Sequence, residues 1–222
     1  MIELNGVSKS YRNQKIFHEC NFALNQGDIA LISGASGSGK SLFLKMILGM
    51  DSYDSGVINL YGSNLKKTKN KNIIDIRSRI GAVFQNSSLV DCINIFENIA
   101  LKLYFNKHSS AEIKYRISSI LDLFSLSSKQ KFYPKLLSSS DYYLVLIARA
   151  LISNPSLLVL DEPHLKLNES ALNILMQVIN AVNKSSISVL ITCSDFDLYK
   201  SLGCKKYLLR NNSISRVDKV VL

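Results

Sequence analysis

The sequence predicts an α/β fold, in which helices wrap a mainly parallel β-sheet and a helical subdomain is inserted into this α/β core. Short runs of β-type residues alternate with helical stretches over most of the chain, a pattern typical of parallel sheets. Residues 94–150 interrupt this alternation with apolar positions at three- to four-residue spacing. The chain has 222 residues, 47% of them apolar, which is enough to bury a substantial core.

The first part of the chain is expected to place strands around a glycine-rich loop. Apolar runs bounded by polar residues predict strands at residues 2–7, 16–24, 29–33 and 56–61. The apolar stretch after the glycine-rich loop predicts a helix at residues 40–48. Residues 64–72, with the sequence NLKKTKNKN, are polar and basic, which predicts a loop.

The second part of the chain encloses the helical stretch between further strands. Strands are expected at residues 80–84, 157–160, 188–192 and 205–209, and further helices at 168–182 and 196–202. We therefore expect a single domain over residues 1–222. Its α/β core would comprise residues 1–86 and 154–222, and its helical subdomain residues 87–153.

A phosphate-binding motif lies between a predicted strand and a predicted helix, which is the context that this motif requires. Its glycines let backbone N–H groups curl around phosphate oxygens, and the helix N-terminus adds partial positive charge. We expect Lys40 to reach the β- and γ-phosphates and the Ser41 hydroxyl to coordinate Mg²⁺. The alternative is a glycine- and serine-rich loop that binds nothing. The motif consists of Gly34, Ala35, Ser36, Gly37, Ser38, Gly39, Lys40 and Ser41.

Two carboxylates end the continuous apolar strand at residues 157–160. Asp161 suits Mg²⁺, either directly or through a water molecule. Glu162 is placed to orient and deprotonate an attacking water. The alternative is an acidic strand end that caps the next helix, and the phosphate-binding motif favours the catalytic interpretation.

Together these motifs resemble those of the ATP-binding cassette (ABC) ATPases, and the resemblance covers nearly the whole chain. Tyr11 stands where that family stacks an aromatic ring on adenine. Gln85 matches the glutamine that contacts Mg²⁺ and water and senses the membrane partner. Residues 133–138 and 147–151 frame the family's signature motif. For Tyr11 alone, packing against neighbouring residues is the alternative.

The resemblance implies a P-loop NTPase with a RecA-like core, an N-terminal antiparallel β part and an inserted helical subdomain. It implies that ATP and Mg²⁺ bind, that Glu162 and Gln85 act in catalysis, and that Ser41, Gln85 and Asp161 surround the metal. It also implies a homodimer or heterodimer on an integral membrane partner, peripheral to the cytoplasmic side of the cell membrane.

Within the family, length and spacing are closest to the FtsE-like subunits that pair with FtsX in cell division. The LolD-like lipoprotein-release and MacB-like export proteins are nearly as close. Residues 89–100 also resemble the MlaF-like ATPases of phospholipid trafficking.

The signature motif departs from the family pattern LSGGQ, since residues 137–141 read Leu-Ser-Ser-Ser-Asp. Glycine at the third and fourth positions permits close backbone approach to the γ-phosphate held by a second subunit, and two serines obstruct that approach. Ser138 remains available to contact the γ-phosphate. Asp141 adds an anion near a polyphosphate, which is repulsive unless another group neutralises it.

The histidine that would follow Thr192 is also missing, because Cys193 takes its place and is a poor donor without positive charge. In the expected Leu-Asp pair after the acidic strand end, Asn168 replaces the aspartate. His164 follows Pro163 and is a candidate substitute, although a polar loop histidine is the interpretation we favour. The residues expected to bind nucleotide within one subunit are thus present, whereas residues expected to complete a closed dimer are replaced by others.

Three functions compete. The first is an ATPase subunit that energises or gates a membrane partner. The second is a non-hydrolysing ATP switch, favoured by the eroded signature motif. The third is a nucleic-acid-associated ABC ATPase, which only the net charge of +10 supports; we expect no nucleic-acid partner, because no basic patch is interleaved with aromatic residues. The remaining alternative is a protein that has lost its activity through genetic drift and keeps only the fold.

The charge is unevenly distributed, with a net +8 in residues 63–135 against 0 in residues 1–62. The resemblance puts that segment near the membrane subunit, where basic side chains meet anionic lipid headgroups. The four cysteines form no CxxC pair, which predicts reduced thiols. The N-terminal residues lack the apolar segment of a signal peptide, so we expect none. No stretch of the sequence approaches the ~18 consecutive apolar residues of a membrane span.

Overall fold

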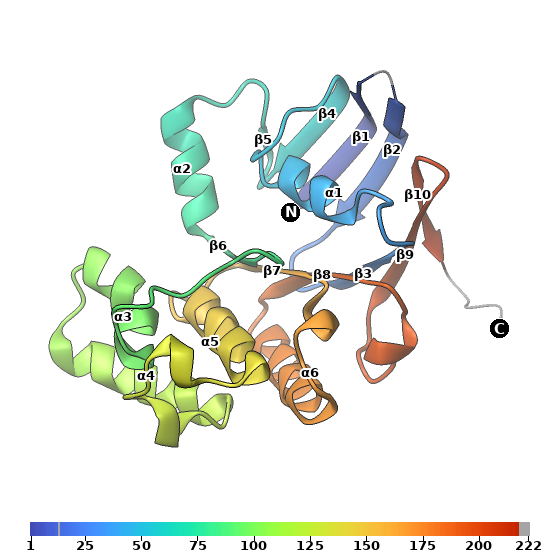
Figure 1. Cartoon of the computed structure of the whole chain (residues 1–222). Helices are drawn as coiled ribbons and strands as arrows, with labels where there is room; N and C mark the ends of the chain where they lie inside the picture. Colours follow the sequence, from blue (N-terminus) through green and yellow to red (C-terminus); the bar gives the residue numbers. More distant parts are fainter. Residues whose placement is uncertain (13, 218–222) are drawn as a thin grey trace.

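The computed structural model describes residues 1–12 and 14–217, except for the side chains of residues 70 and 71. Its strands form two sheets, and the helices of the second half of the chain lie together below the larger sheet in Figure 1. The four-stranded sheet has the order β2-β1-β4-β5, and the six-stranded sheet has the order β10-β9-β3-β8-β7-β6. The mixed α/β architecture agrees with the expected fold class.

The smaller sheet is antiparallel and is built from β1 (Ile2–Tyr11), β2 (Gln14–Leu24), β4 (Ser55–Leu60) and β5 (Ser63–Asn64). Along β2, Phe17, Phe22 and Leu24 are buried, whereas the positions between them are largely exposed. This alternation is typical of a sheet with one buried face. The buried face packs on helix α1 (Lys40–Ile47), whose Phe43 makes edge-to-face contacts with Phe17 and Phe22.

The larger sheet contains β3 (Ile29–Ser33), β6 (Ile80–Val83), β7 (Leu157–Asp161), β8 (Ser188–Cys193), β9 (Lys205–Arg210) and β10 (Ser213–Val217). Strands β3, β6, β7, β8 and β9 pair in parallel, and β10 is antiparallel to β9. Every residue of β3, β7 and β8 is buried. Such continuous apolar runs are expected where both faces of a parallel sheet are covered.

The two faces of the larger sheet contribute to two separate hydrophobic cores. Ala30 and Ile32 pack with α1 and the antiparallel sheet, whereas Ile29 and Leu31 pack with the helices on the opposite side. The same alternation occurs along β7 and β8. The sheet is therefore the shared wall of both cores, as the two-residue side-chain period of a strand requires.

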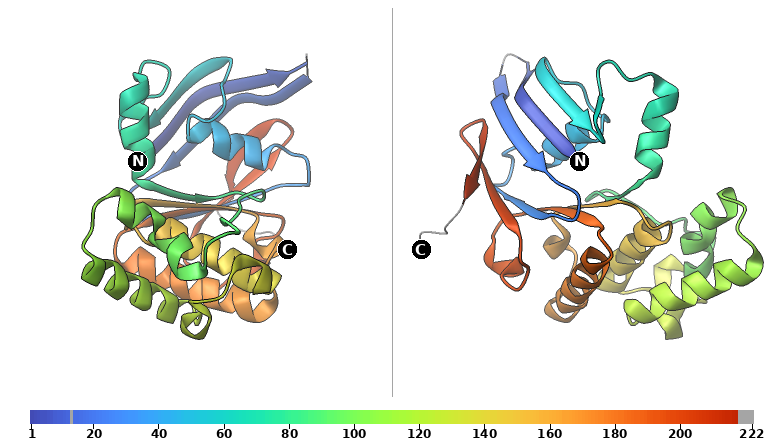
Figure 2. Two further views of the ribbon diagram at one scale, coloured as in Figure 1. Left: turned by 60° about the vertical axis from the view of Figure 1, so that its left-hand side comes forward. Right: turned by 180° about the vertical axis from the view of Figure 1, so that it is seen from behind.

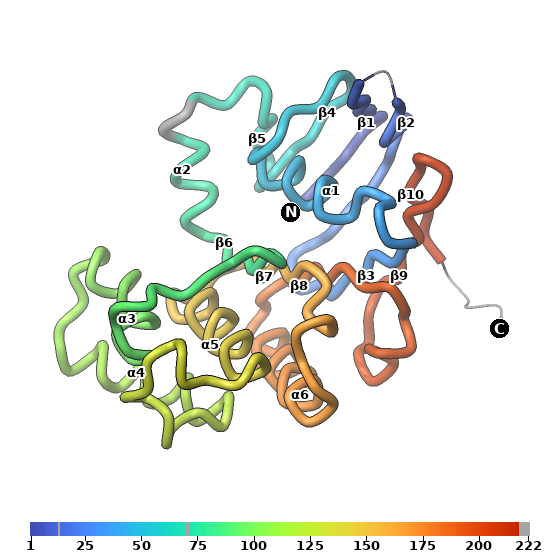
Figure 3. The backbone as a smooth tube through the Cα atoms, in the orientation of Figure 1, coloured from blue at the N-terminus to red at the C-terminus, as the bar shows by residue number. Residues whose placement is uncertain are grey.

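The helical part consists of α3 (Ile95–Phe105), α4 (Ser110–Leu123) and α5 (Ser139–Leu151), with α6 (Glu169–Lys184) beside it under the sheet (Figure 2). Asn94 and Glu97 form a capping box that fixes the start of α3. Helices α3 and α5 pack together, and buried residues of α3, α4, α5 and α6 belong to one core with the sheet. The backbone leaves the sheet after β6 and returns to it at β7 (Figure 3).

Several elements differ from those expected. Helix α2 (Asn70–Ser78) occupies the end of the segment expected to be a loop; only Ile76 among its described side chains is buried, so its sequence lacks a strong apolar pattern. The helix expected at 196–202 is a single 3₁₀ turn, Asp197–Tyr199, started by the Asp195 carboxylate, which accepts a hydrogen bond from the Asp197 N–H. Strand β10 was not expected from the sequence. None of the helices in the described ranges combines the length and the apolar character that crossing a bilayer requires.

Replacing Phe43 with alanine tests the core between the two sheets. Phe43 is fully buried, so we expect Phe43→Ala to lower the free energy of unfolding by about 3–5 kcal/mol through lost burial and a cavity. Urea denaturation measures the change. Phe105→Ala is the control, because this ring is 84% exposed and its loss should change stability by no more than about 0.5 kcal/mol. Equal losses in the two variants would contradict this description of the core.

Candidate functional site

The candidate site lies where three strands of the larger sheet end. Strand β3 ends at Ser33 directly before the glycine-rich loop, β7 ends at Asp161, and β8 ends at Cys193. The three strands are parallel neighbours, with Ser33 paired to Cys193 and Asp161 paired to Thr192. Parallel pairing brings their carboxyl ends to one edge, which is where ligands bind in open α/β sheets.

The loop between β3 and α1 has the conformation that its glycines permit. Gly37 and Gly39 have φ angles of 78° and 98°, in the left-handed region that other residues rarely adopt. A Cβ at Gly39 would lie 2.9 Å from the Phe17 ring, and one at Gly34 would lie 2.7 Å from the Leu209 carbonyl oxygen. The loop therefore needs glycine for its conformation and for its close contacts.

Lys40 begins α1 and is only 4% exposed. Its ammonium group donates hydrogen bonds to the carbonyl oxygens of Gly34 (2.6 Å) and Ala35 (3.0 Å). It also forms an ion pair with Glu162, with 3.2 Å between Nζ and Oε1. A buried cation requires such partners, and here they join the glycine-rich loop to the end of β7.

The two carboxylates at the end of β7 are held in different ways. Asp161 is 2% exposed and accepts a hydrogen bond from the Thr192 hydroxyl at 2.7 Å. The Glu162 N–H donates to the same hydroxyl oxygen at 2.9 Å, and the Gln85 amide donates to Glu162 Oε2 at 2.6 Å. Glu162 has a φ of 46°, a left-handed conformation that is strained for a residue with a side chain and is common at functional sites.

Of the residues predicted to form the site, the contacts bring Lys40, Gln85, Asp161 and Glu162 into one cluster. Thr192 was not predicted, although it holds both Asp161 and Glu162. A hydroxyl at the end of a buried strand that neighbours the acidic strand is the signal that points to it. Ser33 is a second residue of this kind, since its hydroxyl donates to the Ser194 carbonyl oxygen at 2.9 Å.

The residues of this site suit a nucleoside triphosphate with Mg²⁺. The Ser38 hydroxyl is buried in the glycine-rich loop and has no hydrogen-bond partner among the residues that the structure describes, as expected of a group that meets a phosphate oxygen. Ser41, Gln85 and Asp161 offer the oxygen ligands that Mg²⁺ prefers. No cluster of three or more His, Cys, Asp or Glu residues occurs in the described part of the chain, so a metal here would depend on phosphate oxygens as well.

Two further predicted residues lie apart from this cluster. Tyr11 ends β1, is 61% exposed and has the Arg12 guanidinium 5.5 Å from its ring centre. This exposure argues against a packing role and leaves a ring face open to solvent. Ser138 caps the N-terminus of α5, and its hydroxyl is hydrogen-bonded with Asp141. The roles of Tyr11 and Ser138 stay predictions.

Lys129 neutralises the anion in the altered signature motif. The Lys129 ammonium lies 2.6 Å from Asp141 Oδ2, and the Ser138 hydroxyl donates to the same oxygen at 2.6 Å. Partial burial opposes ionisation, but these hydrogen bonds outweigh it and hold the pKa of Asp141 below its ordinary value. The repulsion expected between Asp141 and a polyphosphate is therefore reduced by a cation of the same chain.

Cys193 contributes no group to the cluster. Its side chain is fully buried in the core shared with the helices, and burial raises the pKa of its thiol to about 12. A neutral, buried thiol cannot replace a histidine as a hydrogen-bond donor to phosphate. Cys20, Cys92, Cys193 and Cys204 are free in the structure.

The family model for the ABC transporter matches residues 17–165, which include the glycine-rich loop, Gln85 and both carboxylates. The chain belongs to the ABC transporter family. It is similar to the methionine import ATP-binding protein MetN of Campylobacter jejuni, with 31% identity over 96% of this chain and 69% of that protein. MetN of Clostridium acetobutylicum is also 31% identical, over 94% of this chain and 65% of its own length.

Solved structures of ABC cassettes share the fold. The dimeric ATP-binding cassette MJ0796, described in a post-hydrolysis state with ADP and Pi, superposes with a TM-score of 0.87. Its identity is 25%, and the match covers 99% of this chain and 100% of that one. This ABC domain is thus a P-loop ATPase domain that binds ATP with Mg²⁺. The MetN relatives do not support the FtsE-like subtype expected from the sequence.

Removing the Lys40 ammonium tests the nucleotide site. We expect Lys40→Ala to weaken ATP binding by about 10- to 100-fold, because the phosphates lose a charge-assisted donor. A fluorescent ATP analogue in a titration with Mg²⁺ measures the affinity. Lys184→Ala, at the exposed end of α6, is the matched control and should bind as the wild type does. Unchanged affinity in Lys40→Ala would show that the loop does not hold the phosphates.

Proposed function

We propose that this chain is the nucleotide-binding subunit of an ABC uptake system, docked on an integral membrane partner at the inner face of the membrane. The named relatives are methionine import proteins, which supports transport of a small solute rather than the cell-division role of an FtsE-like subunit. Lipoprotein or phospholipid transport, the other transport roles weighed from the sequence, lacks this support. The dimeric cassette of similar fold supports a dimeric working state.

One observation carries the proposed mechanism: the cluster within one subunit is complete, whereas the groups that would close over it from a second subunit are altered. Lys40, Gln85, Asp161 and Glu162 are joined by contacts of 2.6–3.2 Å or through Thr192. Ser139 and Ser140 replace the expected glycines, and the Cys193 thiol is buried. In well-studied enzymes, loss of a single stabilising donor slows the reaction about 10²- to 10³-fold. ATP binding with slow hydrolysis in a homodimer is the result.

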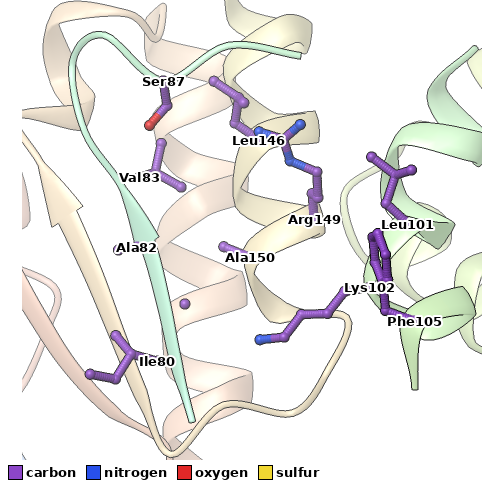
Figure 4. Close-up of a pocket in the computed structure, with 11 residues that line it drawn as sticks. Ile80, Ala82, Val83, Ser87, Leu101, Lys102, Phe105, Leu146, Arg149 and Ala150 are labelled. Atoms are coloured by element: carbon purple, nitrogen blue, oxygen red, sulfur yellow. The ribbon is translucent and has the colours of Figure 1, made fainter. Parts of the chain in front are cut away.

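A groove lined by neighbours of Gln85 in the sequence is the proposed docking place of the membrane partner. It has a volume of about 330 Å³ and lies between β6, α3 and α5, with Phe105 and Leu101 facing Leu146 and Arg149 (Figure 4). Val83 and Ser87 line it, and Gln85 lies between them in sequence. A short helix of the partner seated there would press on the segment that carries Gln85, and through Gln85 on Glu162.

Basic side chains lie at the groove and on the segment that precedes α2. Lys102 lines it and donates a hydrogen bond to the Ser78 carbonyl oxygen at the end of α2, at 2.9 Å. Lys66, Lys67 and Lys69 are exposed on the segment that leads into α2, with the Lys66 ammonium 4.2 Å from the centre of the Tyr53 ring. Helix α2 connects this exposed basic stretch to the contact of Lys102 at the groove, and the positive charge of the stretch suits anionic lipid headgroups.

A second candidate function is a non-hydrolysing ATP switch, which the altered signature motif and the buried Cys193 favour. Comparing Glu162→Gln with Lys40→Ala in the complex with the membrane partner separates the two functions. The glutamine keeps the shape of the side chain but removes the base. If hydrolysis drives uptake, both variants lose transport, and Glu162→Gln still binds ATP. Transport retained in Glu162→Gln and lost in Lys40→Ala would instead favour the switch.

The wild-type chain and Lys40→Ala also test the proposal as a whole. We expect the wild type to bind ATP in the millimolar range or more tightly, and to hydrolyse it faster with its membrane partner than alone. Failure of the wild type to bind ATP at millimolar concentration would overturn the proposal.

Neutralising the basic segment tests the membrane-facing side. The triple variant Lys66→Gln, Lys67→Gln, Lys69→Gln should bind vesicles with anionic lipids more than tenfold more weakly, since each basic residue contributes about 1 kcal/mol near such a surface. ATP affinity should not change. Lys71 belongs to the same stretch, but its side chain lies outside the described residues.

A matched triple variant controls for the loss of charge. Lys166, Lys184 and Lys200 are exposed elsewhere on the molecule, so changing them to glutamine removes the same charge without touching this segment. Vesicle sedimentation should give near wild-type binding for the control. If both triple variants lose binding equally, net charge rather than this segment attracts the membrane.

A further inference from the structure

A hydrogen bond joins the two loops on either side of the candidate catalytic base. His164 lies in the 3₁₀ turn Pro163–Leu165, which begins directly after Glu162. Its Nε2 atom lies 3.0 Å from the hydroxyl oxygen of Ser194, the first residue after β8. The contact therefore connects the turn that carries Glu162 with the loop of residues 194–196, which we call the switch loop.

The switch loop is also attached to the phosphate-binding loop. The Ser33 hydroxyl donates to the Ser194 carbonyl oxygen at 2.9 Å, and Ser33 directly precedes Gly34. Gly34 in turn accepts a hydrogen bond from the Lys40 ammonium. A continuous series of contacts thus runs from His164 through Ser194 to Ser33 and the loop around Lys40, and the ion pair between Lys40 and Glu162 closes the ring.

The surroundings of His164 differ from those of the polar loop histidine expected from the sequence. The ring is half-buried and packs edge-to-face on Tyr199, with 6.4 Å between ring centres. Its Nδ1 atom is buried and has no hydrogen-bond partner among the described residues. Burial lowers the pKa of His164, and Lys40 acts in the same direction, against Glu162 and Asp195. A fixed, partly desolvated imidazole with a buried nitrogen calls for a structural or functional explanation, which an exposed histidine does not.

We propose that His164 is a positioning residue, which couples Glu162 to the switch loop through Ser194. This rests on the proposed function, because it presumes that ATP binds between Lys40 and Glu162. A ligand that separates Lys40 from Glu162 displaces Glu162 and the turn that follows it. The hydrogen bond between His164 and Ser194 then transmits this displacement to the switch loop.

A double-mutant cycle in the full chain tests the coupling. His164→Ala and Ser194→Ala should each slow single-turnover ATP hydrolysis about tenfold, the loss expected for one broken hydrogen bond in the reacting state. The double variant should be no slower than His164→Ala alone. ATP affinity should stay within twofold of the wild type, and His164→Gln, which offers an amide to Ser194, should restore most of the rate. His108→Ala is the control, since that histidine pairs with Glu112 on α4.

Hydrogen exchange gives a readout that needs no turnover. MgATP should protect the backbone amides of residues 194–196 in the wild type and in His164→Gln, but not in His164→Ala. Equal protection in the wild type and His164→Ala, additive rate losses in the cycle, or no protection in a wild type that binds ATP would each overturn the coupling. Absence of ATP binding by the wild type would instead overturn the proposed function, so the two failures are distinguishable.

Discussion

The buried ammonium group of Lys40 constrains much of the structure around the site. A cation that is 4% exposed must be paired, and its partners come from two distant segments: the carbonyl oxygens of Gly34 and Ala35, and the Glu162 carboxylate. These partners meet only if β3 and β7 end at the same edge of the sheet. Strand β8 lies between them and supplies Thr192, which fixes both carboxylates at the end of β7.

The same sheet separates the nucleotide site from the groove proposed for the membrane partner. One of its faces packs on α1 and the antiparallel sheet, which support the phosphate-binding loop, and the other packs on the helices around the groove. Gln85 lies just beyond β6, which lines the groove, and its exposed side chain donates a hydrogen bond to Glu162 in the cluster. In the proposed function, a partner seated in the groove would act on the nucleotide site through Gln85.

Much of the fold was predictable because it depends on two local sequence signals, apolar runs and a glycine-rich motif. The continuous apolar runs of β3, β7 and β8 and the glycines before Lys40 identify the sheet and the phosphate loop without any knowledge of the tertiary structure. Helix α2 was missed because its few buried positions give no helical period, and β10 because it lies on the sheet edge. The ion pair of Glu162 with Lys40, the hydrogen bonds of Thr192 and the bond between His164 and Ser194 join residues that lie far apart in the sequence. No local sequence pattern predicts such contacts.

The contacts of Lys40 also determine how an anion enters. In the structure its hydrogen-bonding capacity is directed at protein oxygens, and Glu162 serves as an internal counter-ion. A phosphate therefore arrives by exchange, and its affinity is the difference between the contact it gains and the carboxylate contact it displaces. Gln85 and Thr192 gain influence over that affinity through their hydrogen bonds with Glu162.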